Sequence, residues 1–236
     1  MPANLLLGRD MFVLSCEPAT CAIPEWHREL FRGRDEVVTS AEGWSPGSLN
    51  LAQAFATKLR SLLAHGDITR LLIDFSRHPD DPERFSRFSK TLTEDQRHKL
   101  DERHHRSFLN LLKQRIIEEQ RRSGLAIHLT FRTEDRPGMP AVEFLHSGER
   151  EIETKFVDRW RTRLQSTYPE LSVSSGNDDG YGLSRYLRDE FPTAFGSVSV
   201  VAARSSFLEG TPVRWDRLKK ILLETLPQSL ETLPQS

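Results

Sequence analysis

Cysteine and long apolar runs are both scarce in this 236-residue sequence. Its two cysteines, Cys16 and Cys21, are too few for a disulfide framework, so we expect both to be reduced. No run approaches the roughly 18 apolar residues that a membrane span needs. The N-terminal residues also lack the basic segment of a signal peptide. These absences predict a cytoplasmic protein with no membrane partner.

An excess of charge of one sign is missing as well. The 33 Lys and Arg residues are balanced by 34 Asp and Glu residues, which leaves a net charge of −1. No global field therefore attracts nucleic acid, and we expect no nucleic-acid partner. The run Asp158–Leu164 interleaves aromatic and basic residues, but its helical spacing predicts one core face and one solvated face.

Apolar patterns of period two and period 3.6 alternate along the chain and predict alternating strands and helices. The predicted strands cover 11–16, 70–75, 125–131, 171–174 and 197–203, and the predicted helices 48–64, 93–122, 149–167, 182–191 and 213–223. The longest helix should begin at the capping box Thr93-x-x-Gln96 and end near Gly124. This order predicts one α/β domain, a three-layer α/β/α sandwich with a mostly parallel central sheet.

The heptad LETLPQS occurs twice in succession, at 223–229 and 230–236. A proline at the same place in each copy prevents one continuous helix. We therefore expect residues 1–222 to form the domain and 223–236 to form a flexible tail. A tail that binds a partner protein is the alternative.

Polar turns follow all five predicted strands, at the sheet edge where ligands bind in open α/β folds. The side chains in these turns that can bind a ligand are Glu17, Asp74, Arg77, Arg132, Asp178 and Arg204. We expect them to form one site. The alternative for any single residue is that polar side chains simply populate strand ends.

Three segments carry a family resemblance: SCEPATCAIP at 15–24, EGWSPGSLNLA at 42–52 and TRLLIDFSRHPDDPERFS at 69–86. They resemble, in order, a Ser-Cys-Glu-His-Ala-x-Asn-x-Ile-Pro turn, a Gly-Trp-Asp-Pro-Gly-Ala segment and a Ser-Arg-Leu-x-x-Asp-x-Asn-Arg stretch of the N-formylglutamate amidohydrolase family. That family consists of metal-dependent hydrolases with a zinc-exopeptidase-like α/β fold. Weaker similarities at 101–112, 126–133 and 200–209 extend the resemblance over nearly all of the first 210 residues.

The resemblance places the catalytic positions of the family on residues of the wrong chemistry. It implies metal ligands at Pro18, Ser45 and Arg132, and a general base at Ala202. Proline offers no donor atom, serine is a poor ligand, a guanidinium is cationic, and alanine cannot take a proton. The resemblance therefore implies an inactive or altered member of the family that needs no cofactor. The alternative is an active amidohydrolase with a relocated zinc that cleaves N-formyl-L-glutamate or a related N-acyl amino acid.

The part of the family site that faces the substrate survives better. The resemblance implies that Asp74, Arg77 and Arg204 line a pocket for a small carboxylate or N-acyl amino acid, because an arginine clamps a carboxylate without a metal; a protein partner is the other option. Loss of a divalent cation would leave the carboxylate of Glu17 uncompensated. We therefore predict that Arg132 reaches Glu17, or a bound anion, within salt-bridge distance.

Rival sites are weaker. Cys16 could act as a nucleophile, but no histidine is tied to it, so we predict a half-buried strand-end residue. His98, Glu102 and His105 have the spacing of one helix face and could bind a transition metal, but nearby arginines favour a solvated charged face. His128 lies in an apolar strand, which predicts a hydrogen-bonded core histidine. The loop 174–182 contains calcium-type ligands but lacks the spacing of an EF-hand, so we predict a turn.

Overall fold

Six strands form one mixed sheet in the computed structural model, which describes residues 11–208 and 212–227. The strand order is β2-β1-β3-β6-β4-β5. The strands are β1 (Phe12–Cys16), β2 (Leu63–His65), β3 (Ala126–Glu134), β4 (Val142–His146), β5 (Val173–Asn177) and β6 (Phe195–Ala203). Neighbouring strands are parallel from β2 to β6, whereas β4 pairs antiparallel with β6 and carries β5 parallel to itself. The prediction of a mostly parallel sheet is confirmed.

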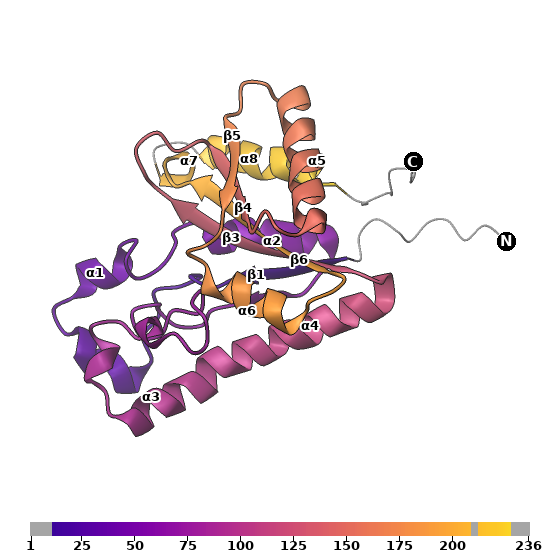
Figure 1. Cartoon of the computed structure of the whole chain (residues 1–236). Helices are drawn as coiled ribbons and strands as arrows, with labels where there is room; N and C mark the ends of the chain where they lie inside the picture. The colour runs from indigo at the N-terminus through magenta and orange to yellow at the C-terminus, as the bar shows by residue number, and fades with distance from the viewer. Residues whose placement is uncertain (1–10, 209–211, 228–236) are drawn as a thin grey trace.

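Helices cover both faces of this sheet (Figure 1). The α-helices are α1 (Asp35–Thr39), α2 (Ser48–Leu59), α3 (Glu94–Leu100), α4 (Ser107–Ser123), α5 (Glu151–Thr167), α6 (Gly182–Glu190), α7 (Ser205–Leu208) and α8 (Pro212–Thr225). Short 3₁₀ helices lie at η1 (Glu25–Phe31), η2 (Pro82–Arg84) and η3 (Ser89–Thr91). The predicted α/β/α layers are confirmed.

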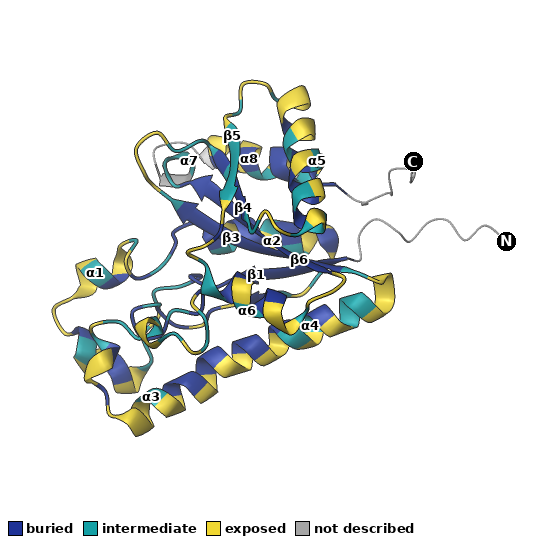
Figure 2. Cartoon of the chain, in the orientation of Figure 1, coloured by how far each residue is buried: buried dark blue, intermediate teal, exposed yellow. Residues whose placement is uncertain are grey.

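Each face of the sheet has its own apolar core. On one face, α2, α5 and α8 pack over Leu14, Phe131 and Val200, with Phe55 and Trp160 among the largest buried side chains. On the other face, α4 and α6 pack with the segment 68–75 over the sheet. Figure 2 shows α4 with its buried side turned to the sheet and its exposed side turned to solvent, as the helical period of its apolar residues requires.

The second predicted strand, Arg70–Phe75, is wrong. Its apolar side chains are buried, including Leu72 and Ile73, but the segment folds into turns whose amides bind scattered carbonyl groups such as that of Arg84. The strand beside β1 is instead β2, which the sequence had suggested as the end of a helix. That helix, α2, ends at Leu59, where Arg60 adopts a left-handed backbone conformation with φ of 54°. β4 was also missed.

The long helix is interrupted. Its capping box at Thr93 and Gln96 is present, and its C-cap Gly124 has φ of +77°, both as predicted. Between α3 and α4, however, Asp101–Arg106 forms a π-helix (η4). A π segment shifts the register of the following turns, so residues that a regular helix would place on one face are separated.

The first copy of the repeated heptad begins inside the fold. Helix α8 continues through Leu223 to Thr225, and the side chains of Thr225 and Leu226 are buried. The second copy, 230–236, lies outside the described residues, so the flexible tail stays a prediction.

Candidate functional site

Glu17 follows β1 directly and is the centre of the predicted site. Only 3% of its surface is exposed. It accepts a short hydrogen bond from the Ser15 hydroxyl, one of 2.6 Å from Thr130 Oγ1 and one of 3.3 Å from Arg132 Nη2. Because Ser15 and Thr130 are register partners on adjacent parallel strands, they point to the same side of the sheet and both reach the carboxylate.

Arg132 neutralises this buried carboxylate. The guanidinium is 5% exposed, forms an ion pair with Glu17 and lies 3.8 Å from the centre of the Tyr181 ring. The Tyr181 hydroxyl donates to Glu134 Oε1 over 2.6 Å, and burial raises the pKa of Tyr181 to about 12. The phenol therefore stays protonated and neutral near pH 7, which suits a ring that stacks on a cation. The predicted contact of Arg132 with Glu17 is confirmed.

The remaining positions implied for a metal and a base do not fit those roles. Pro18 is buried and contributes only its carbonyl, which accepts from the amide of Ser45. The Ser45 hydroxyl is occupied by β3: it donates to the Thr133 carbonyl over 2.9 Å and accepts from the Thr133 amide over 2.8 Å. With a paired hydroxyl, a prolyl ring and a guanidinium, this donor set does not hold a metal cation.

Ala202 faces the other side of the sheet. It pairs in register with Thr133 and belongs to the core under α2, α5 and α8. The two β6 residues next to Ala202, which are Val201 and Ala203, face the side of Arg132 and are also apolar. On this side the described strand β6 presents Ser197, Ser199, Val201 and Ala203, none of which carries an ionisable base.

Asp74 and Arg77 lie near each other, in a pair separate from Glu17 and Arg132. Arg77 Nε lies 3.9 Å from Asp74 Oδ2, and its Nη1 donates to Asp81 Oδ2 over 2.9 Å. The hydrogen bond to Asp81 raises the pKa of Arg77, whose side chain is 44% exposed. Arg204 lies 4.0 Å from Asp135. Neither arginine contacts Glu17 among the interactions described.

Arg70 holds the loop before α2 in place at this edge of the sheet. It donates to the carbonyls of Ala41, Glu42 and Trp44, which anchors the loop before α2. Burial lowers its pKa, while the nearby charge of Asp74 opposes this shift and that of Arg132 adds to it. The charges of both Asp74 and Arg132 therefore act on Arg70. Sequence reasoning missed it, together with Ser15, Thr130, Glu134 and Tyr181.

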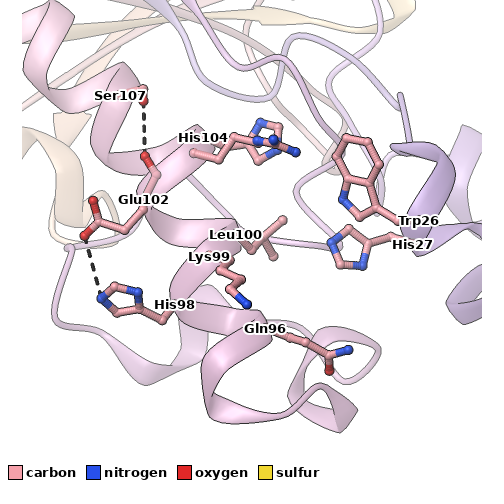
Figure 3. A pocket seen from close by; sticks show the side chains of 10 residues that line it. Trp26, His27, Gln96, His98, Lys99, Leu100, Glu102, His104 and Ser107 are labelled. Atoms are coloured by element: carbon pink, nitrogen blue, oxygen red, sulfur yellow. Dashed lines mark hydrogen bonds and ion pairs between the residues drawn. The ribbon is translucent and has the colours of Figure 1, made fainter.

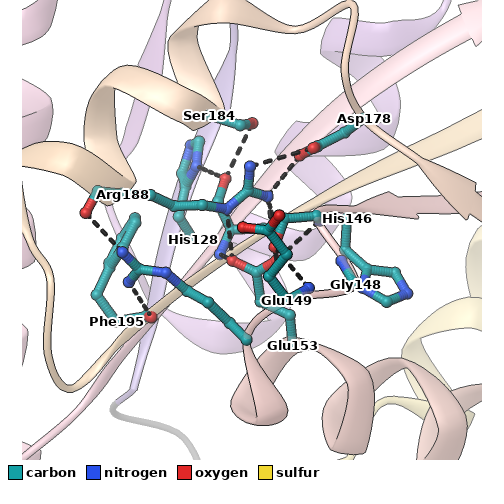
Figure 4. Close-up of polar contacts among 12 residues, drawn as sticks. His128, His146, Gly148, Glu149, Glu153, Asp178, Ser184, Arg188 and Phe195 are labelled. Atoms are coloured by element: carbon teal, nitrogen blue, oxygen red, sulfur yellow. Dashed lines mark hydrogen bonds and ion pairs between the residues drawn. The ribbon is translucent and has the colours of Figure 1, made fainter.

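Asp178 does not belong to this edge. Because β5 runs against β1 and β3, its carboxyl end lies elsewhere, and Asp178 pairs with Arg188. Arg188 also binds both carboxylate oxygens of Glu153 at 2.8 and 3.1 Å (Figure 4). Burial raises the pKa of Asp178, although Arg188 opposes the shift. The prediction that Asp178 joins the site is wrong; its role is in a buried ion-pair network.

A line of polar groups joins this network to Glu17. The His128 ring is fully buried, with Nε2 2.7 Å from Ser15 Oγ and Nδ1 2.9 Å from Ser197 Oγ. Burial lowers the pKa of His128 to about 3, so the ring is neutral. The hydroxyls of Ser15 and Ser197 thus hold the two ring nitrogens of His128. The prediction of a hydrogen-bonded core histidine is confirmed.

Two rival sites, Cys16 and the histidine face of the long helix, differ in part from their predictions. Cys16 is fully buried rather than half-buried, points to the opposite face and donates to Ser48, and burial raises its pKa to about 12. His98 and Glu102 are exposed as predicted, but their shared face with His105 is wrong. The π-helix turns His105 inward, where it pairs with Asp101. No group of three His, Cys, Asp or Glu side chains in the described residues is arranged to hold a metal ion.

The described part of the chain has no helix that could span a bilayer. Three surface cavities lie around η1, η2 and α3, and none of the three is lined by Glu17, Asp74, Arg77, Arg132 or Arg204.

Known proteins resemble this chain in structure alone. No family model matches the sequence, and no curated protein matches it. The gene product Atu2144 from Agrobacterium tumefaciens has a TM-score of 0.74 at 20% identity, over 93% of this chain and 88% of that chain. N-formylglutamate amidohydrolase from Ralstonia eutropha JMP134 has a TM-score of 0.64 at 14% identity, over 96% of this chain and 93% of that chain. At these identities the likeness establishes a shared fold.

Proposed function

We propose that this chain is an N-formylglutamate amidohydrolase-like protein that has lost hydrolysis and binds a small carboxylate, such as an N-acyl amino acid, in the cytoplasm. The fold it shares with a solved N-formylglutamate amidohydrolase supports the family. The three sequence segments that resemble the family motifs support it independently.

One observation carries the loss of hydrolysis. Arg132 Nη2 lies 3.3 Å from Glu17 Oε2, and both side chains are at least 95% buried. The guanidinium supplies the positive charge that a buried carboxylate needs, and it repels a second cation from the same place. A metal activates water by lowering the pKa of the bound molecule, and an arginine cannot replace that function.

Two arginines support binding of a carboxylate. Arg77 is 44% exposed, and the side chain of Arg204 is 18% exposed, so solvent reaches both. Each lies near an acidic side chain, but a guanidinium has five donors and can share them with a ligand. The carboxylate of an N-acyl amino acid matches this chemistry without a metal.

The first experiment measures metal content and turnover. We expect purified protein to contain less than stoichiometric metal and to leave N-formyl-L-glutamate intact with added zinc. N-formyl-L-glutamate should nevertheless raise the melting temperature, because it binds the native state. Arg77→Ala should abolish that rise and Arg121→Ala, an exposed control on α4, should preserve it. Stoichiometric metal or chelator-sensitive turnover would refute the loss of hydrolysis.

The second experiment restores the missing ligands. Pro18→His, Ser45→Asp and Arg132→His together should create zinc affinity if the positions correspond to the family's ligands. The control carries Pro18→His and Ser45→Asp with Arg136→His, which places the second imidazole at a more exposed arginine position near Glu134 and Glu143. Isothermal titration with zinc should give one site per chain in the first variant only. Equal zinc binding by both would contradict the correspondence.

A further inference from the structure

A groove of about 700 Å³ opens between η1 and the helix formed by α3, η4 and α4. Figure 3 shows Leu100 and His104 projecting from this helix toward Trp26 and His27 of η1. Trp26 is 63% exposed and Leu100 is buried, so the groove has an apolar wall and floor. An exposed tryptophan beside a cavity is typical of a binding surface.

His104 is the unusual residue of this groove. It is 9% exposed, and its Nδ1 lies 2.8 Å from Asp67 Oδ2 in the loop after β2. Burial opposes ionisation of Asp67, but the hydrogen bond with His104 holds the pKa of that carboxyl below its usual value. In the tautomer with its proton on Nδ1, His104 donates to Asp67 and carries its lone pair at Nε2. That Nε2 is buried and has no partner among the described residues.

A buried polar atom without a partner is rare and calls for a ligand or water. The π-helix explains its position, because it turns His104 and His105 inward together. Asp67 fixes the ring, and a fixed imidazole with one free nitrogen is the arrangement that receives a proton donor from a ligand.

Permanent positive charges complete the groove. Lys99 lines it and pairs with Asp95, which is outside the lining, over 2.7 Å; the Arg103 guanidinium lies 4.9 Å from the centre of the Trp26 ring. The one acidic side chain in the lining, Glu102, already pairs with His98 and Arg106. The groove therefore favours an anion.

We propose that this groove binds a small organic anion that combines an aromatic body with an N–H or O–H donor. The aromatic body contacts Trp26 and Leu100, the anionic group lies toward Lys99 and Arg103, and the donor bonds to His104 Nε2. This site goes beyond the proposed function, because none of its residues belongs to the Glu17–Arg132 edge.

Two matched probes test the proposal by isothermal titration. Hippurate has a phenyl ring, an amide N–H and a carboxylate, and 3-benzoylpropionate replaces only the N–H by CH₂. We expect hippurate to bind about fivefold more tightly, the usual effect of one net hydrogen bond. His104→Ala should remove this difference between the probes. Equal affinity of the two probes for the native protein, or no saturable binding of hippurate, would overturn the proposal.

Exposed variants keep the test valid if His104→Ala fails to fold. Trp26→Ala and Arg103→Gln should each weaken hippurate several-fold, while Arg121→Gln, an exposed arginine of α4 outside the groove, should not. Hippurate is itself an N-acyl amino acid, so Arg77→Ala serves as a second control. Binding that is lost in Arg77→Ala but intact in Trp26→Ala would overturn this site and leave the proposed function standing.

Discussion

Replacing Arg132 by methionine tests how strongly the structure depends on the buried ion pair. The two charged atoms are 3.3 Å apart. At an effective dielectric constant of about 20, their attraction is about 5 kcal/mol before desolvation is counted. Removing one partner of a buried pair costs about 3 to 5 kcal/mol of unfolding free energy. We expect about 3 kcal/mol, because Glu17 keeps the hydroxyl hydrogen bonds from Ser15 and Thr130.

The assay is a double-mutant cycle with urea unfolding followed by tryptophan fluorescence. It compares Arg132→Met, Glu17→Gln and the double variant, with Arg121→Met as an exposed control. We expect a coupling energy of about 2 kcal/mol, within the usual range for residues in direct contact. The melting temperature of Arg132→Met should fall by about 6 to 12 °C for a chain of this size. Additive effects within about 0.5 kcal/mol would refute the inference that the arginine compensates the carboxylate.

Three further predictions concern buried groups. Native protein treated with iodoacetamide at pH 8 should be modified at Cys21 and not at Cys16, whose pKa is raised to about 12 by burial; peptide mapping that finds equal labelling would contradict this. The folded pKa of His128, about 3, lies below its unfolded value of about 6.5. Its contribution to the unfolding free energy is therefore complete above pH 6.5 and is lost as the pH decreases. Between pH 6.5 and 5 the native protein should lose about 2 kcal/mol that His128→Gln does not lose in urea unfolding; parallel losses would count against a neutral ring. A Cβ at Gly66 would meet a backbone carbonyl oxygen at 2.1 Å, so Gly66→Ala should cost about 1 to 3 kcal/mol in thermal unfolding. Gly180→Ala, which meets nothing within 4 Å, should be neutral, and equal melting temperatures of the two variants would show that the close approach is not rigid.

Local signals in the sequence predicted the features that depend on neighbouring residues. The capping box at Thr93 and the left-handed Gly124 are decided within one helical turn, and both are present. The segment Arg70–Phe75 was mistaken for a strand because burial of Leu72 and Ile73 produces the same apolar run in a packed loop. The π-helix has no such signal, since the contacts of its inward side chains are with distant segments: His104 binds Asp67 and His105 stacks on Phe75.

Some contacts of the candidate site could likewise be predicted from the sequence and others could not. Glu17 and Arg132 were predicted to meet because an arginine compensates a carboxylate, and the pairing of the parallel strands β1 and β3 brings them together. Asp178 was misplaced because nothing local revealed that β4 and β5 run in reverse. Tyr181 was missed because its contact with Arg132 joins distant segments, and a tyrosine near a glycine carries no signal of a stacked cation.

The proposed replacement of a metal by Arg132 would change what this edge can do with a ligand. Arg132 gives one nitrogen to Glu17 and the face of its guanidinium to Tyr181, while its Nε is buried and has no hydrogen-bond partner among the described residues. The edge thus keeps a cationic donor for a ligand oxygen or a water molecule, but it has no group that lowers the pKa of water. Ser199 on adjacent β6 also has a buried hydroxyl without a partner in the described chain. Unused donors beside a compensated carboxylate support the proposed recognition of an oxygen-rich ligand without hydrolysis, and ligand-induced stabilisation measured together with turnover tests that proposal.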